Sequence, residues 1–326
     1  MSAYMDDPAV EEHPRQKIAI LGPRKSGKSS ICQVLFNKMP ALDTIYIDST
    51  LTPTEYTFSA FVDFTIIELP YSEDEDTFQY QDTLKECASL IYVIDSQAGY
   101  HDAVYNMQFV IEQAMHVRPT INIEVFVHKV DGLSEDFRFD QQRVISQRVT
   151  DELMDSGFVN VSLSFYQTSI YDSTIYDAMS RVVQKQIPQI GTLENLLNVL
   201  CQHSGIDRAL LFDIKSKLLV AEDANYMSMP MYEVSIDFID ITIGMNSLYV
   251  SDKRLANSAI ENGSEPRRQL AATSRMNNGD VLHLQQMVKG LTLVCLVKSD
   301  SLPKIALVEY NIELFREAME QLWMLG

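Results

Sequence analysis

Lys17-Ile-Ala-Ile-Leu-Gly-Pro-Arg-Lys-Ser-Gly-Lys-Ser-Ser30 is the stretch of sequence that decides the fold. A short apolar strand runs here into the pattern G-x-x-x-x-G-K-S, and Ile31, Val34 and Leu35 continue with helical spacing. A chain that wraps its backbone N–H groups around a polyphosphate needs glycine at the bends, and the start of a helix adds positive polarisation. The pattern in this setting predicts a phosphate-binding loop.

Each residue type within the loop has an expected task. We expect Lys28 to reach the β- and γ-phosphates of a nucleotide and Ser29 to offer its hydroxyl to Mg²⁺. The other loop residues predicted to line the site are Arg24, Lys25, Ser26, Gly27 and Ser30. The alternative is an ordinary Gly- and Ser-rich turn, which the strand before the loop and the helix after it disfavour.

The totals indicate a globular chain of two domains. The 326 residues are 46% hydrophobic and 22% charged, enough for sizeable cores, and only the polar start, residues 1–16, is expected to be flexible. With 45 acidic against 26 basic residues the net charge is -19, which opposes attraction to nucleic acid or anionic lipid. We therefore expect neither nucleic-acid binding nor direct membrane insertion.

Cysteines and terminal signals narrow the location. Four cysteines lie far apart without a C-x-x-C pair, so the sequence predicts buried thiols in a reducing compartment and no zinc site or disulfide framework. We find no signal sequence, no apolar run near the roughly 18 residues of a membrane span, and no C-terminal cysteine. Any membrane location is expected to come through a partner.

The segment 44–54 is polar and rich in threonine, and it is expected to be a loop. In a nucleotide switch, a loop at this point supplies a threonine whose hydroxyl coordinates Mg²⁺ and whose N–H senses the γ-phosphate. Thr50 is the candidate for that role, with Thr44 nearer the ribose. Without the preceding motif, the segment would be interpreted as a solvated turn.

Residues 58–69 have the pattern of two paired strands that end at Glu68-Leu-Pro-Tyr71, where a guanine-nucleotide switch has D-x-x-G. Glu68 can still accept a hydrogen bond from Mg²⁺-bound water, one methylene further out. Tyr71 restricts the backbone swing that glycine would allow. No Gln follows to orient water, and the acidic run Glu73-Asp-Glu-Asp76 is interpreted as a solvated, mobile switch segment or as a docking patch.

Two apolar strands are expected at 90–95 and 121–128, with a helix over 100–116 between them. The second strand ends His128-Lys-Val-Asp131, in the place of N-K-x-D. Asp131 can accept two hydrogen bonds from the guanine N1–H and 2-amino group, which adenine lacks, while the Lys129 stem covers the base. His128 replaces the usual Asn and can tie back to the phosphate loop; the alternative is a purely structural histidine.

A helix over 140–155, a strand over 161–166 and a helix over 175–186 complete the alternation. The strand leads to Gln167-Thr-Ser-Ile170, where the backbone N–H groups of Ser169 and Ile170 are expected at guanine O6. Strands alternating with helices over the first 187 residues predict a doubly wound α/β fold with a mostly parallel sheet. Nucleotide is then expected at the carboxyl ends of the strands.

Pro188 can end the preceding helix, so we place a domain boundary there. The second half predicts an α+β layer: helices over 193–203, 231–249 and from 305, strands over 209–213, 218–221, 281–288 and 291–298, and a long polar loop over 251–280. The last helix carries one apolar stripe, interpreted as core or dimer packing: Ile305, Val308, Ile312, Phe315, Met319 and Leu322.

These motifs together resemble the Rag/Gtr GTPases, specifically the RagC/RagD-like half of the family. The resemblance rests on the loop R-K-S-G-K-S-S, the D-S-T segment, V-I-D-S-Q, the variant H-K-V-D-G-L-S-E-D and Y-Q-T-S-I-Y-D, and it extends over nearly the whole chain. It implies a Ras-like GTPase domain over 17–187, followed by a roadblock/longin-like dimerisation domain over 188–326.

The resemblance also implies cofactors, partners and a location. The cofactors are GTP/GDP and Mg²⁺, and the dimer partner is a RagA/RagB-like GTPase bound through the C-terminal domains. A lipidated Ragulator/EGO-like scaffold would hold this cytoplasmic pair peripherally on the vacuole or lysosome. There the GDP-bound subunit would relay amino-acid sufficiency to the target-of-rapamycin kinase complex.

The expected rate of hydrolysis and three rival functions complete the prediction. Because the sequence shows no Gln, switch Gly or obvious cis arginine, we expect slow intrinsic GTP hydrolysis and an activating protein. Tyr71 motivates the rival, a pseudo-GTPase subunit with a fixed or empty pocket. An ATP-using kinase does not explain H-K-V-D or T-S-I, and a vesicle-trafficking GTPase would end in prenylated cysteines soon after residue 187.

Overall fold

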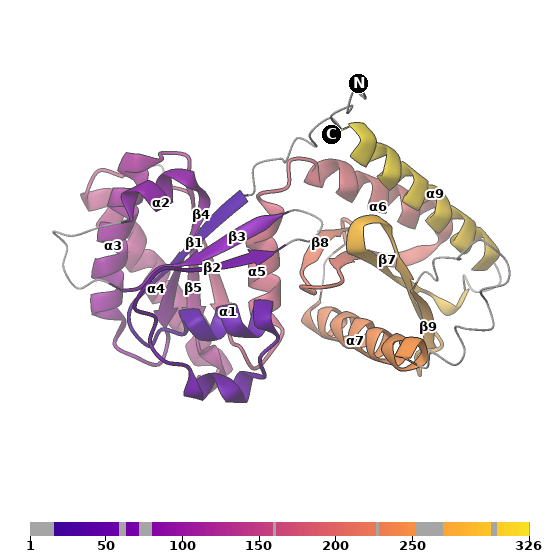
Figure 1. Cartoon of the computed structure of the whole chain (residues 1–326), viewed down its shortest axis with the longest axis horizontal. Coiled ribbons are helices and arrows are strands. Elements are labelled where there is room, and N and C mark those ends of the chain that lie inside the picture. Colours follow the sequence, from indigo (N-terminus) through magenta and orange to yellow (C-terminus); the bar gives the residue numbers. More distant parts are fainter. Residues whose placement is uncertain are drawn as a thin grey trace, which may run out of the picture.

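The computed structural model describes residues 16–58, 63–71, 80–158, 161–225, 228–251, 270–300 and 305–325. The expected flexible N-terminus up to residue 15 and the acidic run 73–76 lie outside the described residues. Two sheets, each covered by helices, form the two lobes seen in Figure 1.

The first sheet has six strands in the order β2-β3-β1-β4-β5-β6. Its strands are β1 Gln16–Leu21, β2 Thr54–Phe58, β3 Phe64–Glu68, β4 Cys87–Asp95, β5 Asn122–His128 and β6 Leu163–Thr168. All neighbouring pairs are parallel except β2 with β3, which is antiparallel. The predicted doubly wound, mostly parallel sheet is confirmed, and its register brings the last residues of the parallel strands to one edge, as in the pairing of Asp95 with His128.

Helices cover both faces of this sheet, so its central strands are buried on both sides. They are α1 Lys28–Asn37, α2 Gln81–Glu86, α3 Tyr100–Val117, α4 Glu135–Asp155 and α5 Thr174–Gln184, with short 3-10 turns η1 Ala41–Tyr46 and η3 Val130–Gly132. One core joins Ala19 and Leu21 to Met107 of α3 and Ile145 of α4. On the opposite face, Ile18 and Ile20 alternate with them in β1 and pack with α1 and α5.

The second sheet is antiparallel, in the order β8-β7-β11-β10-β9. Its strands are β7 Ile206–Asp213, β8 Leu219–Glu222, β9 Ala271–Arg275, β10 Val281–Gln286 and β11 Leu291–Val297, with the turn η4 Val288–Gly290 between the last two. Helices α6 Ile190–Ser204 and α9 Ile305–Leu325 pack on one face, and α7 Met229–Ser251 packs on the other (Figure 1). The predicted α+β, roadblock-like layer is confirmed.

Several local expectations were wrong. Strand β2 lies at the end of the segment expected to be a loop, earlier than the strand pair predicted over 58–69, and η1 covers the start of that loop. Strand β9 lies inside the segment expected to be a long loop; its side chains are mostly exposed, so it lacks the apolar alternation that marks a strand. The short helix α2 was not expected. Helix α4 begins at Glu135 rather than near Asp140, because Glu135 and Asp136 in its first turn suit the positive end of the helix dipole.

The two lobes meet along α5 and β8. Leu219 of β8 donates its N–H to Ser180 Oγ at 2.9 Å, and Arg181 pairs with Glu222 at 2.9 Å. The predicted boundary at Pro188 falls between the end of α5 and the start of α6. Across the part of the chain that the structure describes, every helix is too short or too polar to cross a bilayer.

Candidate nucleotide site

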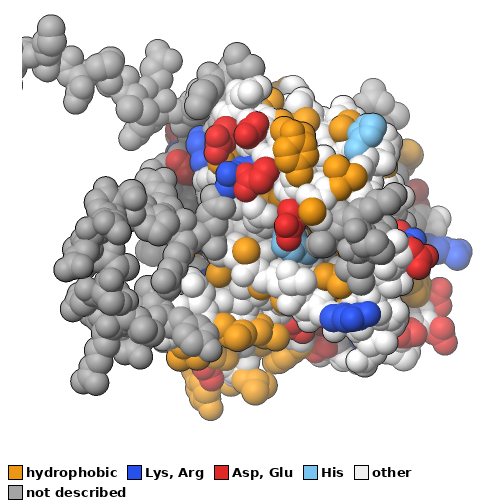
Figure 2. All heavy atoms as spheres, turned by 90° about the vertical axis from the view of Figure 1, so that its right-hand side faces the viewer, with side chains coloured by type: hydrophobic (Ala, Val, Ile, Leu, Met, Phe, Trp, Pro, Cys, Tyr) orange, Lys and Arg blue, Asp and Glu red, His pale blue; other side chains and the backbone are white. Residues whose placement is uncertain are grey.

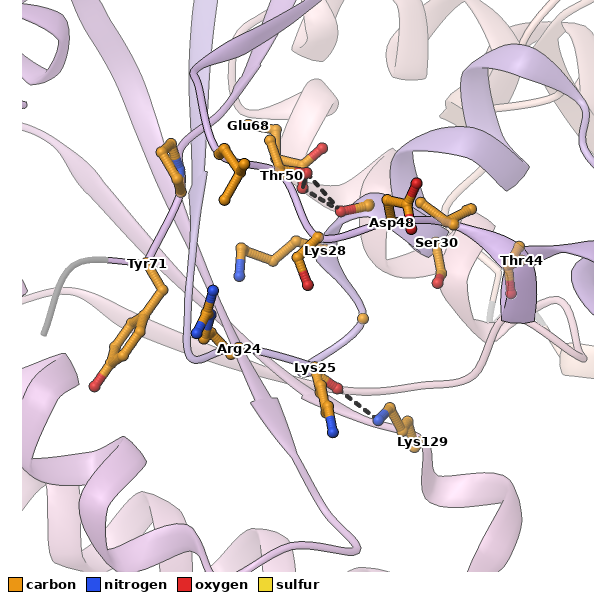
Figure 3. Close-up of a pocket in the computed structure, with 16 residues that line it drawn as sticks. Arg24, Lys25, Lys28, Ser30, Thr44, Asp48, Thr50, Glu68, Tyr71 and Lys129 are labelled. Atoms are coloured by element: carbon orange, nitrogen blue, oxygen red, sulfur yellow. Dashed lines mark hydrogen bonds between the residues drawn. The ribbon is translucent and has the colours of Figure 1, made fainter.

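A pocket of about 240 Å³ opens where β1 and β3 end (Figure 3). Among the residues predicted to bind nucleotide, those that line it are Arg24, Lys25, Gly27, Lys28, Ser29, Ser30, Thr44, Thr50 and Lys129. Glu68 and Tyr71, which carry the departures from D-x-x-G, also line it. Ser26, His128, Asp131, Ser169 and Ile170 do not line this pocket.

The loop between β1 and α1 can take its shape only with glycine at two positions. Gly22 has φ +145° and Gly27 has φ +105°, values that other residues rarely adopt. A Cβ on Gly22 would lie 2.3 Å from the Val93 carbonyl oxygen, and one on Gly27 would lie 2.6 Å from His128 Cδ2. The two glycines let the chain bend tightly into the start of α1, the setting in which backbone N–H groups can hold an anion.

Lys28 is the buried cation of this cradle. Its Nζ donates to the carbonyl oxygens of Gly22 at 2.7 Å and Pro23 at 3.0 Å, and it lies among the pocket residues in Figure 3. Burial lowers the pKa of Lys28 to about 8, and the nearby Glu68 carboxylate opposes that shift. A buried ammonium held only by carbonyl dipoles is well suited to pair with phosphate oxygens.

Three oxygen-bearing side chains meet beside Lys28. Ser29 Oγ donates to Glu68 Oε1 at 2.5 Å, Thr50 Oγ1 donates to the same oxygen at 2.9 Å, and the two hydroxyls are 3.0 Å apart. Ser29 comes from α1, Thr50 from the segment before β2, and Glu68 from the end of β3. Hydroxyl and carboxylate oxygens are what Mg²⁺ prefers, and the rest of its shell comes from water and phosphate. The residues present fit the ion.

The opposite end of the site is joined to the loop through Lys129. Its Nζ donates to the Lys25 carbonyl oxygen and to Asp95 Oδ2, both at 2.6 Å. The sequence reasoning did not assign Asp95, although it ends an apolar strand at the same edge of the sheet. These bonds fix the Lys129 stem beside the pocket, where Figure 3 shows it next to Lys25.

Asp131 and Ser169 come from two different strand ends and are in direct contact. Ser169 Oγ donates to Asp131 Oδ1 at 2.7 Å. The Ser169 N–H, expected at guanine O6, instead donates to Thr174 Oγ1 at 2.9 Å. Ile170 packs against the core under β1 and α5. Among the described residues, the second carboxylate oxygen of Asp131 accepts no hydrogen bond.

His128 packs between the phosphate loop and Thr168 at the end of β6. Its ring lies against Gly27, and its Nδ1 is 2.9 Å from Thr168 Oγ1. Burial, and then the neighbouring Lys129 ammonium, lower the pKa of His128 to about 4, so the imidazole is neutral near pH 7. The expected tie to the phosphate loop is therefore a packing contact, and the hydrogen bond goes to Thr168.

Comparison with known proteins places these features in a family. A model of the Gtr1/RagA G protein conserved region matches residues 17–239. The chain is 43% identical over 314 residues to GTP-binding protein GTR2 of Saccharomyces cerevisiae, covering 94% of this chain and 92% of that protein. It is 39% identical over 323 residues to Ras-related GTP-binding protein C of Homo sapiens, covering 98% of this chain and 79% of that protein. Ras-related GTP-binding protein A of Dictyostelium discoideum is 25% identical over 218 residues, 64% of this chain and 70% of that protein.

Proposed function

This chain belongs to the Rag/Gtr family of GTP-binding proteins, and from that premise we propose that it is a guanine-nucleotide switch, the RagC/RagD-type subunit of a heterodimer. The observation that carries the proposal is the cluster of Ser29, Thr50 and Glu68 beside Lys28. It joins the phosphate loop to the two segments whose positions report the γ-phosphate in a switch. GTP or GDP with Mg²⁺ is the ligand that suits this set.

Different residues bind the phosphates, the Mg²⁺ ion and the ribose. Lys28 and the loop N–H groups hold the phosphates, with Ser26 and Gly27 as part of the cradle and Arg24, Lys25 and Ser30 around it. Ser29 and Thr50 coordinate Mg²⁺, and Glu68 accepts from a water on the ion. Thr44 lies on the ribose side. Its hydroxyl already donates to the Ala41 carbonyl at 2.8 Å, so its contact is by packing.

The base is selected at the other end. Asp131 accepts from the guanine N1–H and 2-amino group, and Lys129 covers the ring. The N–H of Ile170 lies at O6, while Ser169 donates its own N–H to Thr174 and uses its Oγ to hold Asp131 in place. Neutral His128 keeps this subsite packed on the loop.

The family are GTPases, and we propose that this member hydrolyses GTP slowly alone. Hydrolysis requires water to attack the γ-phosphorus while the bond to the β-phosphate oxygen breaks. No described residue at the pocket stands in for the glutamine that usually orients that water. An activating protein supplying such a group can be worth about 10³ to 10⁵ in rate.

Two exposed features of the second lobe support a heterodimer with a Gtr1/RagA-type relative. Helix α7 exposes Ile241, Met245 and Leu248 at 60%, 52% and 73%, and Figure 2 shows apolar side chains gathered at its level of the molecule. Among the described strands, β9 is the last in the order of its sheet and pairs only with β10. Apolar side chains beside the last strand of a sheet suit a second sheet of the same kind.

The wider role rests on the family. The pair is held on the vacuolar or lysosomal surface by a lipidated scaffold and relays amino-acid sufficiency to the target-of-rapamycin kinase complex. The strongly acidic chain, with net charge -19, suits tethering through a partner better than direct contact with anionic lipid.

A second candidate is a pseudo-GTPase subunit, which Tyr71 at the mouth of the pocket favours. Identifying the nucleotide released on denaturing the purified heterodimer separates the two. The switch predicts GTP and GDP in proportions that change with nutrient supply, and slow single-turnover hydrolysis that an activating protein accelerates. One invariant nucleotide, or none, would favour the pseudo-GTPase, and fast unaided turnover would contradict the hydrolysis proposal.

A further inference from the structure

The two carboxylate oxygens of Glu68 have different partners. Oε1 accepts from Ser29 and Thr50, while Oε2 accepts from the Tyr56 hydroxyl at 3.3 Å. Glu68 is 1% exposed, so its orientation is set by these groups and not by bulk water. Gln33 Nε2 in turn lies 3.4 Å from the Tyr56 hydroxyl oxygen. A chain of polar groups thus runs from α1 through β2 to the metal-binding cluster.

The position of Tyr56 follows from strand pairing. The antiparallel register of β2 and β3 sets Thr54 opposite Glu68 and Tyr56 opposite Ile66, so Tyr56 and Glu68 are diagonal neighbours on one face. The Tyr56 ring packs against Phe36, with ring centroids 6.3 Å apart. A tyrosine hydroxyl is protonated at neutral pH and can therefore donate to Glu68.

Resting on the proposed function, we infer that Tyr56 is a positioning residue for Mg²⁺: by holding Oε2 of Glu68, it aims Oε1 at Ser29 and Thr50. A glutamate has one more rotatable bond than the aspartate of D-x-x-G, so its carboxylate has more orientations to lose on binding an ion. The hydroxyl of Tyr56 removes that freedom in advance. The Tyr56 ring packs in the core of the domain, and the Tyr56 hydroxyl orients Glu68 at the site.

The test is the Mg²⁺ concentration at which the full chain retains GDP. GDP release is followed in buffers of rising free Mg²⁺ for the wild type and for Tyr56→Phe, which keeps the ring against Phe36. We expect the midpoint to rise about threefold to tenfold, as the net loss of one hydrogen bond of ordinary strength implies. Tyr92→Phe is the matched control, because it removes a buried hydroxyl that donates to Ala103 O at 3.1 Å and Asn106 Oδ1 at 2.7 Å. That control is expected to lower the melting temperature and leave the Mg²⁺ midpoint unchanged.

A double-mutant cycle distinguishes positioning from general stabilisation. In Glu68→Asp the shorter carboxylate draws away from the Tyr56 hydroxyl, so adding Tyr56→Phe should shift the midpoint no further. An unchanged midpoint in Tyr56→Phe, or the same shift in both backgrounds, would overturn the inference. If the wild type itself showed no Mg²⁺-dependent retention of GDP, the proposed function would fail instead, which is a different result.

Discussion

Lys28 illustrates how a single side chain prepares the site. Its ammonium is removed from water and held by two carbonyl oxygens of its own loop, an arrangement that stabilises the charge only in part. Phosphate oxygens would complete the pairing. The depressed pKa of Lys28, about 8, is the measurable sign of that incomplete environment.

This predicts a pH dependence of nucleotide binding. Bound phosphates raise the pKa of Lys28, so between about pH 8 and pH 9 the complex holds a proton that the free protein has lost. GDP affinity of the nucleotide-free chain should therefore fall with rising pH in that window, by up to about tenfold per unit. Titration calorimetry at several pH values measures it. Lys28→Arg keeps its charge and should give a flat profile; a flat profile in the wild type would contradict the account.

Tyr71 carries a second prediction at this scale. Replacing Tyr71 by Gly opens backbone conformations that cost other residues about 1 to 2 kcal/mol, so the segment can turn its N–H toward a γ-phosphate. The affinity for GTP relative to GDP should rise about fivefold or more. Tyr71→Ala is the matched variant, because it removes the ring without that freedom and should change the ratio little. Equal changes of the affinity ratio in Tyr71→Gly and Tyr71→Ala would contradict this, because the effect would then come from loss of the ring and not from backbone freedom.

At the scale of elements, α7 has two different faces. Tyr232, Ile236 and Ile239 are buried against the second sheet, while Ile241, Met245 and Leu248 are exposed. Exposed apolar side chains gathered on one helix face are typical of an interaction surface.

Charged substitutions on that exposed face should separate the heterodimer. We expect Ile241→Glu with Met245→Glu to abolish co-purification of the partner and to lower the melting temperature of the isolated chain only slightly, because both side chains are already exposed. Phe139→Glu is the control: Phe139 on α4 is 70% exposed but lies in the first lobe, so the pair should remain intact. Loss of the heterodimer with Phe139→Glu, or its survival with the α7 pair, would place the interface elsewhere.

The elements also show what the sequence can predict. Buried strands such as β4 and β5 carry continuous apolar runs, so their positions can be predicted from the sequence. Because the strands are parallel, the motifs at their carboxyl ends can also be predicted to lie at one edge of the sheet. Edge strand β9 and the one-turn helix α2 have too few buried residues to leave a pattern. The contact of Tyr56 with Glu68 depends on strand register and the link of Asp95 to Lys129 on side-chain reach, neither of which spacing along the chain reveals.

At the scale of the whole molecule, the nucleotide site and the second lobe are physically joined through α5. The Ser169 N–H donates to Thr174 Oγ1 at the start of α5, and the preceding Ser173 donates to Glu233 of α7 at 3.1 Å. Further along, Ser180 holds β8 through the Leu219 N–H. The Ser169 segment and helix α7 are thus connected through α5.

The central claim is that a guanine nucleotide binds this chain through Asp131, and base selectivity tests it most directly. In Asp131→Asn the side-chain amide can donate to the 2-oxo group of xanthine but no longer accepts from both guanine donors. We expect the affinity for GDP to fall by about 10²-fold, and xanthosine diphosphate to become the preferred ligand in the same competition assay. Unchanged preference for guanine over xanthine in Asp131→Asn, measured beside the wild type, would contradict the account.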